Sequence, residues 1–161
     1  MNLDTPLRQL LEKTAIVETV VGIASAFDSR DWGRLQSLLA DELDVDYTEF
    51  RGEPPKRITA DAYIKSRREG LEGLRTLHLS TNHEVKISGD QATCLSAYRI
   101  YRANPAGRPG ENRLDTAGRY EHGLIRKEGA WKVVRIRQTV AVRSGNAQVH
   151  GAFRHQPSNT T

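Results

Sequence analysis

The period of the hydrophobic pattern changes near residue 75 of this chain, and that change limits the folds it can adopt. Before residue 75, apolar residues recur every three or four positions, the spacing of amphipathic helices. After it, four long stretches alternate apolar and polar residues as strands do, at about residues 75–88, 91–103, 113–127 and 130–143. Helices followed by a run of strands predict an α+β fold with an antiparallel or mixed sheet.

Three helices are expected in the first half. The first begins with Thr5 as N-cap and Pro6 in the first turn, and it runs to about Phe27. Its buried stripe should consist of the apolar residues at the helical interval, Leu7, Leu10, Leu11, Val17, Val21 and Ala24. Asp31 can cap a second helix over 32–40, residues 43–50 alternate as a strand, and Thr59 can cap a third helix that ends near Leu71.

The connections in the second half are short. Ser88-Gly89-Asp90 and Lys127-Glu128-Gly129 predict tight hairpin turns, and residues 104–112 predict a longer loop. A twisted sheet of four to six strands curls into a cone, and N-terminal helices over its open end would close a pocket. We therefore expect a pocket domain over residues 1–146, followed by a polar tail over 147–161.

The charge is distributed unevenly in this chain of 161 residues, whose net charge is +4. Residues 1–98 contain 12 Lys and Arg against 16 Asp and Glu, whereas residues 99–161 contain 12 against 4. The arginines of the basic half fall singly along the expected strands, at Arg99, Arg102, Arg113, Arg119, Arg135, Arg137 and Arg143. We interpret them as solvated strand faces and expect no nucleic-acid partner, since they do not cluster with interleaved aromatic residues as a surface for single strands would.

No motif indicates a membrane partner or a metal. No apolar run reaches the ~20 residues of a membrane span, and the spacings HxH, HExxH and paired cysteines are absent. Cys94, the single cysteine, falls in a strand-like run and is expected to be a small buried hydrophobe. These features favour a soluble cytoplasmic protein.

Asp28 is the first candidate for chemistry. It follows Val17, Val21 and Ala24 by 11, 7 and 4 positions, within about 40° of each around a helix. Its carboxylate should then point toward the interior and need a partner there. A cap on the turn before Asp31, or a pair with Arg30, explains Asp28 equally well.

His78 is the second candidate. Strict alternation places it on one strand face with Ser80 and Asn82, opposite a face with Leu77, Leu79, Val85 and Ile87. Such a row is either a solvent face or the polar lining of a pocket. A carboxylate bonded to one ring nitrogen would fix the tautomer and make the other nitrogen a general base, so contact with Asp28 decides between catalysis and a structural role.

Other polar and aromatic residues are candidates for contact with a ligand. Asp46 and Tyr47 should point to opposite faces of their strand, so that one looks inward, and a tyrosine there could polarise a carbonyl or simply pack. We expect the substrate to contact Phe27, Trp32, Asn82, Tyr98, Tyr120 and His122.

Several segments together resemble the SnoaL-like branch of the nuclear-transport-factor-2-like superfamily. They are AFDSRDW (26–32), VDYTEF (45–50), TLHLSTNHEV (76–85) with SGDQATC (88–94), and GRYEHGLIRKEGAWKV (118–133), and the resemblance covers about residues 8–146. The resemblance implies a cone-shaped α+β barrel that is often dimeric or trimeric and works without metal or organic cofactor. Branch members include scytalone dehydratase, hexachlorocyclohexane dehydrochlorinase and polyketide cyclases.

The resemblance also implies roles for individual residues. In the dehydratase and the dehydrochlorinase an Asp ending the first long helix pairs with a His on the strand after the third helix, which here are Asp28 and His78. The dehydratase has a substrate-polarising tyrosine where Tyr47 stands. It also has a tyrosine where this chain has Phe27, and a second pocket histidine near the position of Tyr98 or Arg99, which argues against scytalone as the substrate.

The sequence therefore predicts a cofactor-independent lyase or isomerase, in which Asp28 and His78 abstract a proton and Tyr47 stabilises the developing charge. Two alternatives stay open, a polyketide or aromatic-ring cyclase and a module that binds a small ligand without changing it. We expect a homodimer or homotrimer, because the leucine row and the row Val134, Ile136, Val140 and Val142 give the sheet apolar residues beyond one pocket face.

Overall fold

The computed structural model describes residues 4–151. Their helices are α1 (Asp4–Ser29), α2 (Trp32–Leu38), α3 (Thr48–Arg51), α4 (Ala60–Leu71) and a final 3₁₀ turn, η1 (Ala147–Val149). Their strands are β1 (Leu39–Asp46), β2 (Lys56–Thr59), β3 (Arg75–Ser88), β4 (Gln91–Ala103), β5 (Arg113–Lys127) and β6 (Ala130–Gly145). The four long strands and both hairpins that the sequence predicts are confirmed.

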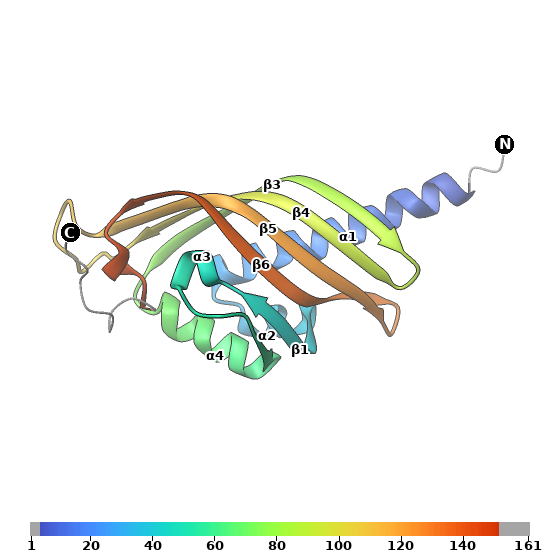
Figure 1. Ribbon diagram of the computed structural model, residues 1–161, viewed down its shortest axis with the longest axis horizontal. Coiled ribbons are helices and arrows are strands. Elements are labelled where there is room, and N and C mark those ends of the chain that lie inside the picture. Colours follow the sequence, from blue (N-terminus) through green and yellow to red (C-terminus); the bar gives the residue numbers. More distant parts are fainter. Residues whose placement is uncertain (1–3, 152–161) are drawn as a thin grey trace.

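The six strands form one mixed sheet in the order β2-β1-β6-β5-β4-β3. Strands β3 to β6 are an antiparallel meander, and β1 pairs parallel with β6 and antiparallel with β2. Figure 1 shows the sheet arching over the helices, with α1 lying along β3 and with α2 and α4 packed near β1. The α+β prediction is confirmed, although the sheet stays open between β2 and β3 and is no closed barrel.

The buried stripe of α1 differs from the predicted one. Ile16, Val20, Ile23 and Phe27 pack into the core, whereas Val21 lies at the surface. Leu7, Leu10 and Leu11 are more than half exposed, because the first turns of α1 extend beyond the end of the sheet and find no strand to cover (Figure 1). Each buried residue thus lies one position before a predicted one, as Ile16 does before Val17. The buried stripe also begins about two helical turns further along α1 than predicted.

The predicted strand over residues 43–50 is wrong at both ends. β1 begins at Leu39, where the short α2 has already ended, and it ends at Asp46. The Asp46 carboxylate accepts hydrogen bonds from the backbone N–H (3.1 Å) and hydroxyl (2.8 Å) of Thr48, an Asx turn that directs the chain into α3. Tyr47 therefore lies at a corner of the fold, buried, rather than in the middle of a strand.

A bulge in β3 changes which residues share a face. Asn82 has φ of +53°, and the pairing of β3 with β4 shifts between Thr81 and Glu84. Beyond this bulge His83 and Val85 turn to the side of His78 and Ser80, while Asn82 is exposed. The predicted row of His78, Ser80 and Asn82 is therefore wrong at Asn82, because strict alternation holds only in an unbroken strand.

The beginning of the predicted tail packs against the domain. Val149 and His150 are buried, and the His150 ring lies edge-on to Phe50 at 5.2 Å between centroids. Residues 152–161 lie outside the described part of the chain.

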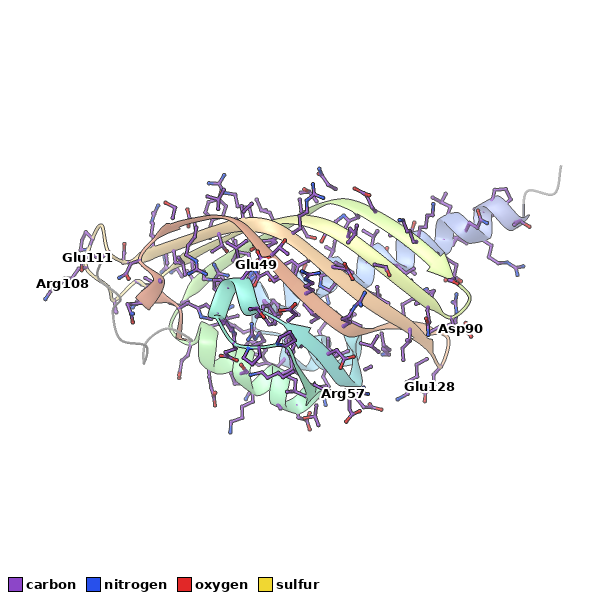
Figure 2. The ribbon with its side chains drawn as sticks, viewed as in Figure 1. Glu49, Arg57, Asp90, Arg108, Glu111 and Glu128 are labelled. Atoms are coloured by element: carbon purple, nitrogen blue, oxygen red, sulfur yellow. The ribbon has the colours of Figure 1, made fainter. Side chains whose placement is uncertain are left out.

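Charged side chains occupy the periphery, for example Arg57 on β2, Asp90 in a hairpin turn and Arg108 in the 104–112 loop (Figure 2). Within residues 4–151 no helix is long and apolar enough to cross a membrane.

Candidate active site

The predicted contact between Asp28 and His78 is present. The Asp28 carboxylate accepts a hydrogen bond from the His78 ring at Nδ1 (2.6 Å) and another from the His78 backbone N–H (2.7 Å). The hydroxyl of Thr76 donates a third bond to the same carboxylate (2.8 Å). These three bonds fix both the position of the ring and its tautomer, which leaves Nε2 as the free nitrogen.

The sequence around Arg30 explains why α1 ends where Asp28 can reach β3. Arg30 adopts φ of +59°, which stops the helix, and Asp31 then caps α2 by accepting a bond from the backbone of Arg34 (2.9 Å). The Arg30 guanidinium donates to the carbonyl of Leu74 (2.6 Å) and to the hydroxyl of Thr76 (3.0 Å). Arg30 thereby ties the end of α1 to the start of β3 instead of forming an ion pair with Asp28, the alternative that the sequence left open.

The surroundings favour an ionised carboxylate beside a neutral imidazole. Burial raises the pKa of Asp28, but the hydrogen bonds from the His78 ring and backbone outweigh it and hold the pKa below its ordinary value. Burial lowers the pKa of His78, and the positive charges of Arg102 and Arg30 add to this effect, whereas Asp28 opposes it. The ring is therefore a free base at neutral pH.

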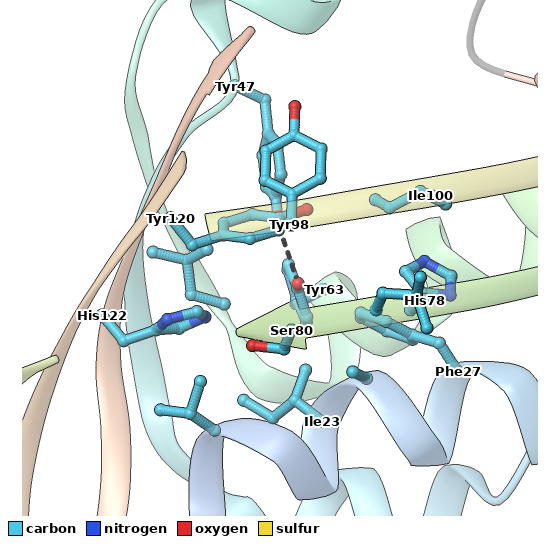
Figure 3. A pocket seen from close by; sticks show the side chains of 14 residues that line it. Ile23, Phe27, Tyr47, Tyr63, His78, Ser80, Tyr98, Ile100, Tyr120 and His122 are labelled. Carbon is cyan, nitrogen blue, oxygen red and sulfur yellow. Dashed lines mark hydrogen bonds between the residues drawn. The ribbon is translucent and has the colours of Figure 1, made fainter. Parts of the chain in front are cut away.

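His78 lies in the wall of a pocket between α1 and the concave face of the sheet (Figure 3). Phe27 packs against the His78 ring on one side, with 5.4 Å between ring centroids. Tyr98, Tyr120 and His122 line the opposite side, as Figure 3 shows, so four of the six residues expected to contact a substrate do line the pocket. The cavity is narrow, with a volume of about 30 Å³.

Tyr47 faces this pocket and is paired with a residue that the sequence analysis did not select. Its hydroxyl forms a hydrogen bond of 2.8 Å with the hydroxyl of Tyr63 on α4, marked by the dashed line in Figure 3. Burial raises the pKa of both phenols, so both keep their protons at neutral pH. Two hydroxyls that share one hydrogen bond leave one proton free to donate to a ligand.

Two of the residues expected at the site lie elsewhere. Asn82 is exposed at the bulge of β3, and Trp32 packs at the start of α2 with the guanidinium of Arg68 5.6 Å from its ring. His122 does reach the pocket, but burial lowers its pKa to about 4, so it is neutral and is no cationic acid at neutral pH. Cys94 is buried, and burial raises the pKa of its thiol to about 11, which confirms the predicted inert hydrophobe.

A second, more polar chamber, the inner chamber, adjoins the pocket described above, the outer pocket. The two share Phe27, Tyr47, His78, Ile100 and Tyr120, and the inner chamber adds Arg51, Arg67, Arg102, Gln138 and His150. The interpretation of Arg102 as part of a solvated strand face is wrong, because this residue is only 4% exposed. Arg102 follows Tyr98 by four residues along β4, and an even spacing puts two residues on the same side of a strand, so the sequence could have predicted that Arg102 points inward. Arg67 follows Tyr63 by four residues on α4, about one helical turn, and could have been predicted to face inward in the same way.

Within residues 4–151 no group of three or more His, Cys, Asp and Glu side chains is arranged to hold a metal ion.

The fold is an open α+β cone with an acid–imidazole pair in the wall of its pocket, which defines a class of small pocket domains. The chain belongs to the family of SnoaL-like domain proteins, whose family model matches residues 8–137. This match confirms the resemblance inferred from the sequence segments. One curated relative, a dehydratase of Pestalotiopsis microspora, is 28% identical over 118 residues, which cover 68% of this chain and 74% of the relative.

Solved structures share the fold at low sequence identity. A protein of Novosphingobium aromaticivorans assigned as a scytalone dehydratase has a TM-score of 0.73 and 20% identity, covering 84% of this chain and 88% of its own. A type 2 hexachlorocyclohexane dehydrochlorinase has a TM-score of 0.73 and 18% identity, covering 96% of this chain and 99% of its own. At these identities the likeness establishes the fold.

Proposed function

We propose that this protein is a cofactor-independent lyase that eliminates water, or a similar small leaving group, from a small hydrophobic or aromatic substrate. The observation that carries the proposal is the 2.6 Å bond from His78 Nδ1 to Asp28 in the wall of an enclosed pocket. The names of the relatives support it, since one is a dehydratase and one solved structure is a dehydrochlorinase, and both names describe eliminations.

His78 supplies the base in this proposal. Its Nε2 takes a proton from a carbon that a neighbouring carbonyl acidifies, the C–H electrons form a double bond, and the bond from the next carbon to the hydroxyl breaks. Asp28 stabilises the imidazolium, which then gives its proton to the departing hydroxyl. The substrate is converted into an alkene and water, and the imidazole is restored without any external electron or proton.

The phenol pair supplies the electrophile. One of the two hydroxyls of Tyr47 and Tyr63 has a proton free for the substrate carbonyl, whose oxygen gains negative charge as the proton leaves carbon. The aromatic rings of Phe27, Tyr98 and Tyr120 enclose the reacting atoms and keep bulk water away, which strengthens both interactions. Because burial keeps the phenols protonated, they donate a hydrogen bond rather than act as bases.

The test compares two variants on the same strand. His78→Ala should fold normally and lose about 10²- to 10⁴-fold in turnover, the usual contribution of a general base. Asn82→Gly is the matched control, because Asn82 lies outside the pocket and glycine accepts its positive φ. Undiminished turnover in His78→Ala would exclude the mechanism.

Product analysis separates this proposal from the alternatives. A product lighter than the substrate by one water or one hydrogen halide supports the lyase. A new ring without change of mass would instead establish a cyclase, and a ligand recovered unchanged would establish a binding module.

A further inference from the structure

The inner chamber contains guanidinium groups that are enclosed to an unusual degree. Arg102 on β4 is 4% exposed and Arg67 on α4 is 8% exposed. Arginine side chains are rarely buried in this way without a carboxylate, because removing the charge from water is costly. The cost shows at Arg102, where burial lowers the pKa to about 10. The residue is still charged at neutral pH.

Neither guanidinium has an anionic partner within residues 4–151. Arg102 donates to the hydroxyl of Thr116 (3.0 Å) and lies 5.0 Å from the ring of Phe50. Arg67 lies 4.7 Å from the ring of Tyr47 and 5.2 Å from that of Tyr63. The Nε atoms of both arginines are buried without an acceptor, so each guanidinium retains hydrogen-bonding capacity that the protein itself does not use.

The arginines at the surface behave differently. Arg126 pairs with Glu12 at 2.9 Å, and Arg57 pairs with Glu42 at 2.8 Å. Among the described residues, carboxylates therefore pair with arginines that water could also solvate, and none pairs with Arg102 or Arg67, the two most enclosed.

A third polar group completes the chamber. Gln138 on β6 is 2% exposed, and its amide, which lies near the Tyr98 hydroxyl, makes no well-formed hydrogen bond within the described residues. Its N–H₂ group is a further donor toward the same space, and Arg51 adds a third positive charge to the lining. The Nε atoms of Arg102 and Arg67, buried without an acceptor, together with the buried Gln138 amide are typical of a site that a ligand completes.

The chamber lies directly against the base. His78 lines both chambers, and the charge of Arg102 contributes to the lowered pKa of His78. The inner chamber has a volume of about 20 Å³, which suits a small planar group rather than a whole substrate. A group held there would place the atoms attached to it beside the imidazole.

We infer that the inner chamber is a carboxylate subsite, in which Arg102, Arg67 and the Gln138 amide hold the acid group of the substrate next to His78. The inference rests on the proposed lyase function and names its substrate class, a small acid with a leaving group on the carbon beyond the one that loses its proton. The acid group is then the carbonyl group of the proposed step, and the arginines share with the phenol pair the negative charge that builds up on its oxygens during proton removal. The bound anion also neutralises the charge of Arg102, which makes His78 a stronger base once the substrate is in place.

Benzoate and benzamide test the subsite, because the two are planar and of nearly equal size but differ in charge. Calorimetric titration of the full chain should show benzoate binding about 10- to 100-fold more tightly than benzamide, the effect of charge-assisted hydrogen bonds. Arg102→Gln and Arg67→Gln should each bring the ratio close to one, and Arg102→Lys should restore part of it. Arg108→Gln, which removes an exposed charge in the 104–112 loop, should leave the ratio unchanged.

Equal affinities for the two probes, no saturable benzoate binding at millimolar concentration, or an undiminished ratio in Arg102→Gln would each overturn the inference. If Arg102→Gln fails to fold, as its thermal melting will show, Arg67→Gln decides the matter from a different element. His78→Gln separates this inference from the proposed function. Loss of turnover with benzoate preference retained supports both, whereas turnover retained in His78→Gln removes the lyase mechanism and leaves the carboxylate subsite standing.

Discussion

Replacing Asp28 by Asn keeps the size of the side chain and changes the pattern of donors and acceptors. If the amide N–H₂ group takes the place of the oxygen that binds the backbone of His78, two donors face each other at about 2.7 Å. If it takes the place of the other oxygen, it faces Nδ1 of His78 and the hydroxyl of Thr76, and both can become acceptors. The second arrangement is therefore favoured, and it moves the ring proton to Nε2.

The magnitude of the effect follows from these three bonds. With the proton on Nε2 the base is lost, so turnover should fall by about 10²- to 10⁴-fold. Hydrogen bonds to a carboxylate are each worth roughly 1 kcal/mol more than bonds to a neutral amide. The Asp28 side chain is only 21% exposed, so solvent screens these bonds little and most of the difference should appear in the free energy of unfolding. We expect that free energy to fall by about 2–3 kcal/mol and the Tm by roughly 4–12 °C.

Nitrogen NMR of the ligand-free protein tests the reasoning without a known substrate. The wild type should show His78 protonated at Nδ1, and Asp28→Asn should show it protonated at Nε2 with a lower pKa. Asp31→Asn is the matched control, because asparagine caps a helix as well as aspartate does and Asp31 serves only as the cap of α2. An Asp28→Asn ring still protonated at Nδ1, together with wild-type turnover, would refute the argument.

Three further outcomes are expected. The value of kcat/KM should fall on the acid side of the pH profile, below about 6.5, because only the neutral ring is a base and burial keeps the pKa of His78 below its ordinary value. Arg102→Gln should move this acid-side fall to higher pH, and a wild-type midpoint above about 6.5 contradicts the assignment. Tyr47→Phe and Tyr63→Phe should each retain part of the activity, since one O–H stays free, whereas the double variant should lose about 10²- to 10³-fold in kcat; a double variant no worse than the single ones argues against the phenol pair. Light scattering should show a dimer or trimer that Leu77→Glu converts into a smaller species, because Leu77 is 51% exposed on the outer face of the sheet; a monomeric wild type rejects this expectation.

The sequence predicted those parts of the fold that local patterns determine. The strands β3 to β6 alternate over long stretches, and the turns between them contain glycine where the chain needs a positive φ, at Gly89 and Gly129. The pairing of Asp28 with His78 came from the family resemblance, since the helical wheel alone allowed two directions for the carboxylate. That wheel used Val17 and Val21 as the stripe, although the buried residues are Ile16 and Val20.

What the sequence did not predict depends on contacts between distant segments. The bulge at Asn82 shows no local signal beyond an asparagine, a residue that tolerates left-handed backbone. The hydrogen bond between Tyr47 and Tyr63 joins the corner after β1 to α4, and no local pattern in the sequence predicts that these two segments are in contact. The enclosure of Arg102 arises because β4 lies between two long strands of a curved sheet, and single charges along a strand look the same whether they face solvent or a cavity.

The bond from the His78 backbone to Asp28 also affects how the sheet ends. β3 is the outermost strand on its side, and a strand in that position offers unpaired N–H groups to any other extended chain. Asp28 occupies one of these groups while α1 lies along the same strand. The residue that orients the base therefore also guards the protein against strand addition, so loss of Asp28 should promote aggregation as well as reduce turnover.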